Sequence, residues 1–232
     1  MTSLELLSPS VCGEYYSDID LNLFNSPECQ ELATQAAKGR HLTFLKDTVT
    51  EKAVKVRLCE DGYVAWLLLS QIKQLKPAKT AYKSEILYRD QIELQLPKII
   101  AFTKAAMEQS NYYLWGGTIG PNYDCSGLIQ KAFATSGIWL PRDSYQQESF
   151  TKKIEQTQLL PGDLIFFGEQ KVNHVALYLG EGYYIHSSGP KNGRNGIAID
   201  PFSDQGDEIS SRYYHKFWSC GRVVKSYSAT GN

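Results

Sequence analysis

Three side chains in the second half of the chain have the types and spacing that nucleophilic catalysis requires: Cys125, His174 and His186. A cysteine attacks as its thiolate, and an unperturbed thiol pKa of about 8.5 leaves little thiolate at neutral pH. A helix N-terminus and a neighbouring imidazole both favour the thiolate. Cys125 follows two possible helix caps, Asn122 and Asp124, and precedes apolar residues at helical spacing. We therefore expect Cys125 in the first turn of a helix, with a lowered pKa.

The two histidines lie on strand-like runs that flank Gly180-Glu181-Gly182. A hairpin centred on Glu181 would set His186 opposite Ala176, on the same face as His174 and diagonal to it, about 7–8 Å away between backbones. A two-residue turn would instead put the imidazoles on opposite faces. The catalytic interpretation therefore requires an odd loop or a bulge at this turn.

The elements around these residues alternate between helical and strand patterns. A helix is expected from about Pro97, and a second follows Cys125 and stops at Gly137. Short runs rich in β-branched and aromatic residues then predict strands. The pattern indicates an antiparallel sheet packed on helices, which is an α+β domain. The expected strands cover residues 163–167, 174–179, 183–187, 196–200 and 216–224.

The first part of the chain has a different sequence pattern. Residues 54–58 alternate apolar and polar side chains, Asp61-Gly62 is a hairpin turn signal, and residues 63–67 resume a strand. A small β-barrel fits this pattern. We expect the barrel in residues 1–76, a linker in 77–90, and the α+β domain in 91–232.

Composition excludes several classes of function. The 232 residues carry a formal net charge of −1, so no footprint for nucleic acid or for a membrane surface is visible. Met1 to Ser8 lack the pattern of a secretory signal, and a cytoplasmic location is expected. An odd number of cysteines without a C-x-x-C pair suggests neither a disulfide framework nor a zinc ribbon. The cysteines are Cys12, Cys29, Cys59, Cys125 and Cys220.

Five ordered blocks resemble the NlpC/P60 family of papain-like cysteine peptidases, over about residues 95 to 226. The stretch before them resembles bacterial SH3 domains, and the combination resembles γ-D-glutamyl-L-diamino acid endopeptidases that carry such domains. The expected architecture is thus a papain-like NlpC/P60 domain preceded by a small SH3-like β-barrel. The blocks are Tyr113-Leu114-Trp115-Gly116-Gly117, Asp124-Cys125-Ser126-Gly127, residues 160–167, residues 174–178 and Tyr184-Ile185-His186.

The resemblance assigns a role to each candidate catalytic residue. It implies Cys125 as nucleophile, His174 as general base, and His186 as the polar residue that orients the imidazole. The backbone N–H of Cys125 and the hydroxyl of Tyr113 would stabilise the oxyanion. The alternative for Tyr113 is a core aromatic residue whose hydroxyl reaches the surface.

The resemblance also implies a pocket that holds the free amino terminus of the substrate. Acidic and hydroxyl groups near the nucleophile and a tyrosine from the small domain would form it. Asp124 and Ser144 could instead be helix caps, and Tyr63 could be a packing residue of the barrel. The residues of this pocket are Tyr63, Asp124, Ser126, Asp143 and Ser144.

The expected activity is a metal-independent and cofactor-independent cysteine endopeptidase. Its substrate would be a peptidoglycan-derived peptide, L-Ala-γ-D-Glu-diamino acid, cut at the γ-D-glutamyl bond, in cell-wall peptide recycling. Three alternatives remain open: a non-catalytic protein that binds wall peptide, a secreted wall-lytic endopeptidase of the same chemistry, and acyl transfer to an amine. The preferred diamino acid and the oligomeric state do not follow from the sequence.

Overall fold

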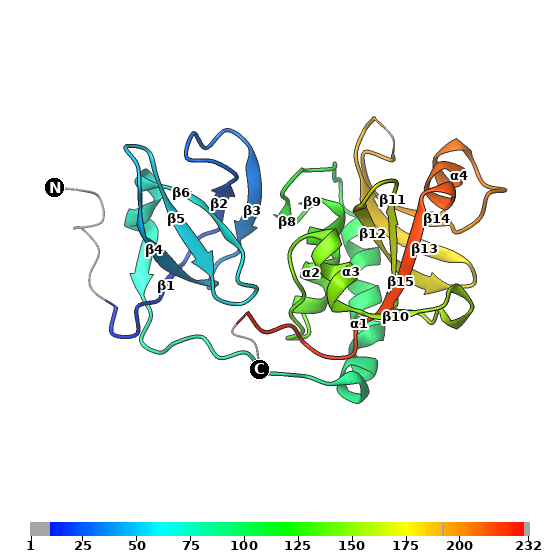
Figure 1. Ribbon diagram of the computed structural model, residues 1–232, viewed down its shortest axis with the longest axis horizontal. Coiled ribbons are helices and arrows are strands. Elements are labelled where there is room, and N and C mark those ends of the chain that lie inside the picture. Colours follow the sequence, from blue (N-terminus) through cyan, green and yellow to red (C-terminus); the bar gives the residue numbers. More distant parts are fainter. Residues whose placement is uncertain (1–9, 192, 230–232) are drawn as a thin grey trace. The chain divides into compact units, whose positions relative to one another are not determined.

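The chain divides into two compact units in the computed structural model, which describes residues 10–191 and 193–229. The first unit comprises residues 1–84 and 228–232, and the second comprises residues 85–227 (Figure 1). The border at Ser84 lies within the segment expected as a linker. The other border differs from expectation, because the second unit ends at Tyr227. Ser228 belongs to the first unit, where its hydroxyl lies 3.1 Å from that of Ser84.

Within residues 10–84, seven antiparallel strands form the SH3-like unit, in the sheet order β3-β2-β6-β5-β4-β1-β7 (Figure 1). Gly62 has a φ of 71° in the turn between β5 and β6, a conformation that glycine adopts at no steric cost. The predicted hairpin of residues 54–67 is confirmed. The strands are β1 Tyr15–Ser17, β2 Leu21–Phe24, β3 Leu32–Ala36, β4 His41–Val49, β5 Ala53–Leu58, β6 Val64–Leu68 and β7 Leu75–Pro77, with a 3₁₀ helix, η2, at Leu69–Gln74.

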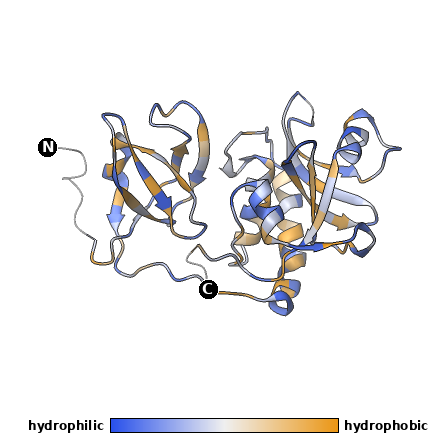
Figure 2. Cartoon of the chain, viewed as in Figure 1, coloured by the Kyte–Doolittle hydropathy of each residue, from blue (hydrophilic) through white to orange (hydrophobic). Residues whose placement is uncertain are grey.

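The core of this unit comes from strand alternation. On β5 the side chains of Val54, Val56 and Leu58 are fully buried, whereas Lys55 and Arg57 between them are not. In Figure 2, hydrophobic and hydrophilic residues alternate in the same way along the strands of this unit. Fully burying a valine or leucine is worth about 1.5–3 kcal/mol, so this face holds the barrel together.

A six-stranded antiparallel sheet and its helices form the second unit, in the strand order β10-β15-β11-β12-β13-β14. In Figure 1 helices α1, α2 and α3 lie to one side of this sheet and α4 lies to the other. The helices are α1 Arg89–Met107, α2 Cys125–Ala134, α3 Ser144–Phe150 and α4 Glu208–His215. The strands are β10 Lys152–Ile154, β11 Leu164–Gly168, β12 Val172–Gly180, β13 Tyr183–Ser188, β14 Gly196–Pro201 and β15 Phe217–Arg222, and the small elements are β8 Thr118–Ile119, β9 Asn122–Tyr123 and the 3₁₀ helix η3 Gln156–Gln158.

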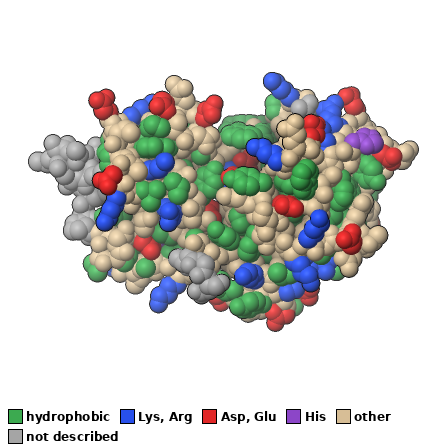
Figure 3. Space-filling view, in the orientation of Figure 1, with side chains coloured by type: hydrophobic (Ala, Val, Ile, Leu, Met, Phe, Trp, Pro, Cys, Tyr) green, Lys and Arg blue, Asp and Glu red, His purple; other side chains and the backbone are tan. Residues whose placement is uncertain are grey.

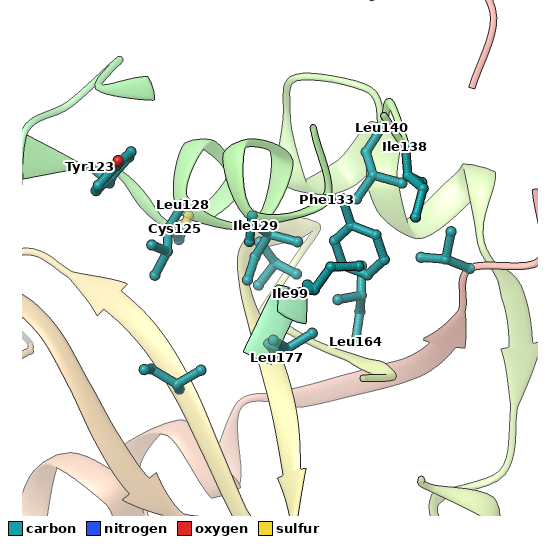
Figure 4. Close-up of a cluster of buried hydrophobic side chains, with 14 of the residues drawn as sticks. Ile99, Tyr123, Cys125, Leu128, Ile129, Phe133, Ile138, Leu140, Leu164 and Leu177 are labelled. Atoms are coloured by element: carbon teal, nitrogen blue, oxygen red, sulfur yellow. The ribbon is translucent and has the colours of Figure 1, made fainter. Parts of the chain in front are cut away.

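Both faces of this sheet are buried. Leu164 and Phe166 of β11 pack in the cluster that contains the residues of α1 and α2. Ile165 and Phe167 point the other way, into a cluster with Tyr213 of α4. Figure 4 shows the first cluster, with Leu128 and Phe133 of α2 facing the strands. Helix α2 is thus fixed to the sheet along its length, and its first residue is held with it.

The hairpin of β12 and β13 has the register that the catalytic interpretation required. Leu177 pairs with Ile185 and Tyr178 with Tyr184, and the register shifts after Tyr178. Glu181 adopts a φ of 53° in the turn. Since a one-residue slip would move every side chain to the other face, this register decides that the two histidines share one face.

Helix α1 corrects one expectation, because it begins at Arg89 and contains Pro97 in its interior. Ile92, Leu96 and Ile99 form one buried stripe along it. Burial of this stripe outweighs the cost of an interior proline, which is about 3 kcal/mol. The strand β7 and the buried Ala78 also lie within or beside the segment expected as a linker.

The helices in residues 10–191 and 193–229 are all too short or too polar to cross a membrane. Figure 3 shows basic and acidic side chains interspersed on the face in view. The expectation about a signal in Met1 to Ser8 falls outside the described residues.

Candidate active site

Cys125 is the first residue of helix α2, as predicted. The side chain of Asp124 caps this helix and accepts a hydrogen bond from the backbone N–H of Gly127, at 2.7 Å. The first N–H groups of a helix have no partner within the helix, so the nucleophile lies where backbone donors and the positive end of the dipole are available.

A buried ion pair fixes the start of α2. Arg142 and Asp124 form two hydrogen bonds, of 2.6 Å and 3.1 Å, and Arg142 also donates to the hydroxyl of Ser126 at 2.9 Å. Asp124 further accepts from the backbone N–H of Gly116 at 2.9 Å. These contacts tie the helix to the turn before it, so the position of Cys125 does not depend on a flexible loop.

The two histidines form a hydrogen-bonded pair next to this helix end. Nε2 of His174 on β12 lies 2.7 Å from Nδ1 of His186 on β13, and both side chains are buried. The Cys125 thiol accepts a hydrogen bond from the backbone N–H of Val175, the residue after His174. The structure thus brings Cys125 to the strand that carries the predicted base.

A pocket of 420 Å³ opens at His174. Tyr113 lines it, which places this predicted oxyanion donor beside the predicted base. Burial raises the pKa values of Tyr113 and Tyr213, and both lie close enough to Cys125 for the charge of its thiolate form to raise them further. The predicted base and the predicted oxyanion donor therefore line one space, and the nucleophile contacts the residue after the base. The remaining lining includes Trp115, Phe167, Asn173, Lys191, Arg212 and Lys216.

The expectation of a lowered pKa for the Cys125 thiol is wrong, because in the structure its pKa is raised. Burial raises the pKa of the Cys125 thiol to about 12, and the charge of Asp124 adds to the rise, whereas the N–H groups of Val175 and Ser126 oppose it. Burial also holds the pKa of His174 well below 6.5. The free site therefore contains a neutral thiol and a neutral imidazole, because burial penalises both charged forms. His174 must then act as a general base when the thiol attacks.

The residues predicted to bind the substrate's amino terminus have local structural partners. Asp124 already accepts from two backbone N–H groups, from Arg142 and from the hydroxyl of Ser126. A carboxylate offers about four acceptor positions, so a substrate ammonium would have to displace one of these donors. Asp143 caps α3 through a capping box with Gln146. Ser144 is the buried first residue of that helix.

Tyr63 belongs to the first unit, where it directly precedes β6. Its half-buried ring packs against the core of the barrel. Its role in substrate binding stays a prediction, as do the roles of Asp124, Ser126, Asp143 and Ser144.

Sequence reasoning missed three residues that surround the histidine pair. Asp200 of β14 lies 2.9 Å from His186 Nε2. Arg194 forms an ion pair with Asp200. The ring of Tyr213 lies 4.6 Å from the ring of His174. The strand over residues 196–200 was expected, but its pairing with β13 follows a long loop whose register the sequence does not reveal. Among the described residues, no group of three or more histidine, cysteine, aspartate or glutamate side chains could hold a metal ion.

Comparison with known protein families gives two matches. Residues 110–222 match the model of the NlpC/P60 family, and residues 23–72 match that of the bacterial dipeptidyl-peptidase SH3 domain. The NlpC/P60 match lies in the second unit, and the SH3 match lies in the first unit. The family model spans the nucleophile, both histidines and Asp200.

Curated relatives match shorter stretches of the chain. The gamma-D-glutamyl-L-lysine dipeptidyl-peptidase of Bacillus cereus is 40% identical over 98 residues, which are 40% of this chain and 28% of that protein. The bifunctional muramidase/DL-endopeptidase CwlT of Bacillus subtilis is 42% identical over 81 residues, 33% of this chain and 25% of that protein. The matched segments thus make up less than a third of either relative.

Among solved structures, an NlpC/P60 family protein from Bacillus cereus aligns with a TM-score of 0.49 at 24% sequence identity, covering 91% of this chain and 63% of that one. The family of each unit is assigned from the two family-model matches. The second unit of this chain belongs to the NlpC/P60 family, and the first contains a bacterial SH3 domain.

Proposed function

We propose that the chain is a cysteine endopeptidase that hydrolyses the bond between γ-D-glutamate and an L-diamino acid in peptidoglycan peptides. The observation that carries this proposal is the buried thiol at the N-terminus of α2, next to the linked imidazoles of His174 and His186. The specificity rests on relatives from Bacillus cereus and Bacillus subtilis that bear the name gamma-D-glutamyl-L-lysine dipeptidyl-peptidase.

The reaction follows from the neutral resting pair. Sγ of Cys125 attacks the γ-carbonyl carbon while His174 accepts the thiol proton, which gives a tetrahedral intermediate. His174 then returns that proton to the nitrogen of the departing diamino acid, the C–N bond breaks, and a thioester remains on Cys125. Water, deprotonated by His174, hydrolyses the thioester and restores the thiol.

The negative charge of the tetrahedral intermediate falls on the former carbonyl oxygen. The backbone N–H of Cys125 and the hydroxyl of Tyr113 are the donors that we assign to it. Burial raises the pKa of Tyr113, and the charge of a Cys125 thiolate would raise it further, so the Tyr113 hydroxyl keeps its proton and can donate it in a hydrogen bond. Donors of this kind are typically worth about 2.7–4 kcal/mol in the transition state.

The pocket at His174 suits the leaving diamino acid. Because His174 protonates the leaving nitrogen, the space next to its ring must hold that part of the substrate. Among the described residues that line this pocket, none is acidic and three are cationic: Lys191, Arg212 and Lys216. Arg212 and Lys216 pair with exposed glutamates, Glu208 and Glu169, and such surface pairs are worth about 0–1 kcal/mol. A carboxylate of the diamino acid can therefore displace the two glutamates from Arg212 and Lys216.

The proposed setting is the recycling of freed wall peptides in the cytoplasm. A free amino terminus on the substrate, held by Asp143, Ser144 and Tyr63, would restrict the enzyme to short peptides. The competing possibility is a secreted enzyme that cuts intact wall. Purified sacculi and a free tripeptide separate the two, since only a wall-lytic enzyme would release peptides from sacculi at a comparable rate.

Mass spectrometry of the products from L-Ala-γ-D-Glu-L-Lys and its meso-diaminopimelate counterpart tests the proposal. The expected products are the dipeptide L-Ala-D-Glu and the free diamino acid, with no turnover by Cys125→Ala. Added amines test for transfer, which would give an amide of the dipeptide. Cleavage at the L-Ala bond, or unchanged turnover by folded Cys125→Ala, would overturn the proposed function. A substrate with an amidated diamino acid carboxyl should bind more weakly if the cationic pocket holds that group.

A further inference from the structure

A buried carboxylate lies behind the histidine pair. On the sheet, His186 of β13 faces Ala198 of β14, so Asp200 lies diagonal to His186 on the same face. Oδ2 of Asp200 is 2.9 Å from Nε2 of His186, and the exposed fraction of Asp200 is 1%. His174, His186 and Asp200 thus form a continuous hydrogen-bonded row across three adjacent strands.

Arg194 keeps this carboxylate ionised. Its Nε lies 3.1 Å from Oδ1 of Asp200, and its Nη2 contacts the same oxygen. Arg194 is itself oriented by Asp207, at 2.6 Å and 2.9 Å, and Asp207 caps α4. Burial alone would raise the pKa of Asp200, but the hydrogen bonds from His186 and Arg194 bring it below its ordinary value. Asp200 is therefore an obligate acceptor at the end of the row.

The partners determine where each proton lies. A carboxylate can only accept, so Nε2 of His186 must carry a hydrogen. Neutral His186 then has its lone pair on Nδ1, and this nitrogen accepts from Nε2–H of His174. The other ring nitrogen of His174, Nδ1, is thereby left as the basic one. When His174 takes up a proton, every hydrogen bond of the row stays in place.

We propose that Asp200, held by Arg194, is a positioning residue that fixes the tautomer of His186 and, through it, the basic nitrogen of His174. The proposal rests on the proposed function of Cys125 and His174, and it adds a fourth residue to Cys125, His174 and His186. Asp200 touches neither substrate nor thiol in this scheme. Its effect on catalysis is transmitted by the two imidazoles.

Among the described residues, the remaining surroundings of His186 offer no competing anion. Its ring packs against the rings of Tyr184, 5.1 Å away, and Tyr213, 4.9 Å away. Burial raises the pKa of Tyr213 to about 12, and burial likewise raises that of Tyr184, so both phenols are neutral at pH 7. His174 is neutral, and Arg194 is the remaining charged group that acts on His186. Asp200 therefore decides the proton position.

The decisive variant is Asp200→Asn, which keeps the size of the side chain but can offer its amide as a donor to His186 Nε2. That donor would reverse the tautomer of His186 and leave His174 with its proton on Nδ1. We expect kcat on the tripeptide to fall by about 10²-fold or more while KM changes little. The alkylation of Cys125 by iodoacetamide should slow in parallel, with no substrate present. Asp204→Asn, at an exposed carboxylate of the loop after β14, is the matched control and should match wild type.

Nitrogen-15 NMR of labelled histidine in the wild-type protein reads the tautomers directly and needs neither substrate nor a variant. The expected signature is a protonated Nε2 and a bare Nδ1 on His186. A proton on Nδ1 of His186, or a folded Asp200→Asn protein with wild-type kcat and alkylation rate, would overturn the proposal. Failure of the proposed function would appear separately, as turnover that survives in Cys125→Ala while the tautomers remain as assigned.

Discussion

The Cys125 thiol and several nearby groups that could carry charge are buried or half-buried, and burial disfavours the charged form of each. The thiol, the Tyr213 hydroxyl and the Tyr113 hydroxyl have raised pKa values, and the imidazole of His174 has a lowered one. Proton transfer between thiol and imidazole therefore creates two charges in a site that holds none of them at rest. Backbone N–H groups at the start of α2 supply the compensation where the thiolate forms.

The first prediction concerns the nucleophile. Cys125→Ala should reduce turnover by about 10⁴-fold or more, because no second thiol shares its contacts with Val175. Cys220→Ala is the matched control, since Cys220 is a buried cysteine of the same unit and its thiol pKa is also raised to about 12 by burial. Initial rates on the tripeptide and urea unfolding of both variants separate chemistry from folding. Comparable losses of activity in both would contradict a specific role for Cys125.

The second prediction concerns pH. The pKa of His174 lies well below 6.5, so the imidazole is neutral at pH 7 and is lost as a base only when the pH falls through that lowered value. The profile of kcat/KM should therefore stay level from pH 7.5 down to 6.5 and decline at lower pH. With thiol and Tyr213 pKa values near 12, no alkaline decline is expected before pH 9. An acid limb centred above pH 6.5 would show that His174 is not held neutral by burial.

At the scale of elements, the approach of α2 to the turn before it decides where the nucleophile lies. Gly127 is in the first turn of the helix, and its backbone lies against the carbonyl of Gly117. A Cβ on Gly127 would meet that oxygen at 2.0 Å, which is far inside contact distance. The glycine is thus required by packing, while its helical backbone would tolerate any residue.

The third prediction follows from this contact. Gly127→Ala should destabilise the second unit by about 1–3 kcal/mol or more, because the turn or the helix must shift. The shift would also move Cys125, so kcat should fall further than the loss of folded protein explains. Lys131→Ala, on the same helix, is the control. Unfolding by urea together with kcat per folded molecule checks both effects. A Gly127→Ala variant with wild-type stability would show that the turn at Gly117 can shift at no cost in free energy.

Local signals predicted much of this arrangement. Asp124 and the apolar spacing after it placed Cys125 at the start of a helix. The turn at Gly180 to Gly182 left two registers open, and the structure has the one that joins His174 to His186. The start of α1 was predicted too late because proline is typical of the first turn of a helix, whereas Pro97 lies in the interior of this one. Asp200 was missed because the loop between β13 and β14 is too long for its ends to fix a register.

At the scale of the whole molecule, each unit has a hydrophobic core of its own. The predicted nucleophile, base, orienting histidine and oxyanion donor all belong to the second unit, and Tyr63 is the one predicted site residue in the first. Substitutions at the surface of the barrel can therefore leave the second unit folded. Kinetics of such variants report whether the first unit takes part in substrate binding.

The last prediction tests this participation through the amino terminus of the substrate. A substrate ammonium between Asp143 and hydroxyl groups gains charge-assisted hydrogen bonds, each worth roughly 1.5–3 kcal/mol, and an acetyl group leaves the acceptors unpaired. Two such losses predict that kcat/KM is about 10²-fold or more lower for the N-acetylated tripeptide than for the free one. In Asp143→Asn, the kcat/KM values for the free and the N-acetylated tripeptide should differ by a smaller factor than in wild type.

Tyr63→Phe should lower kcat/KM for the free tripeptide, although Tyr63 belongs to the barrel, whereas Tyr16→Phe, a half-buried tyrosine on β1, should not. The acetylated tripeptide should respond little to either variant, because its blocked amino group makes no contact for them to remove. Unfolding curves of both variants exclude a general loss of structure. Equal efficiency of wild type on free and acetylated tripeptides would contradict a pocket that holds the substrate's free amino terminus. It would favour an enzyme that cuts intact wall, since glycan-linked peptides carry no free amino terminus.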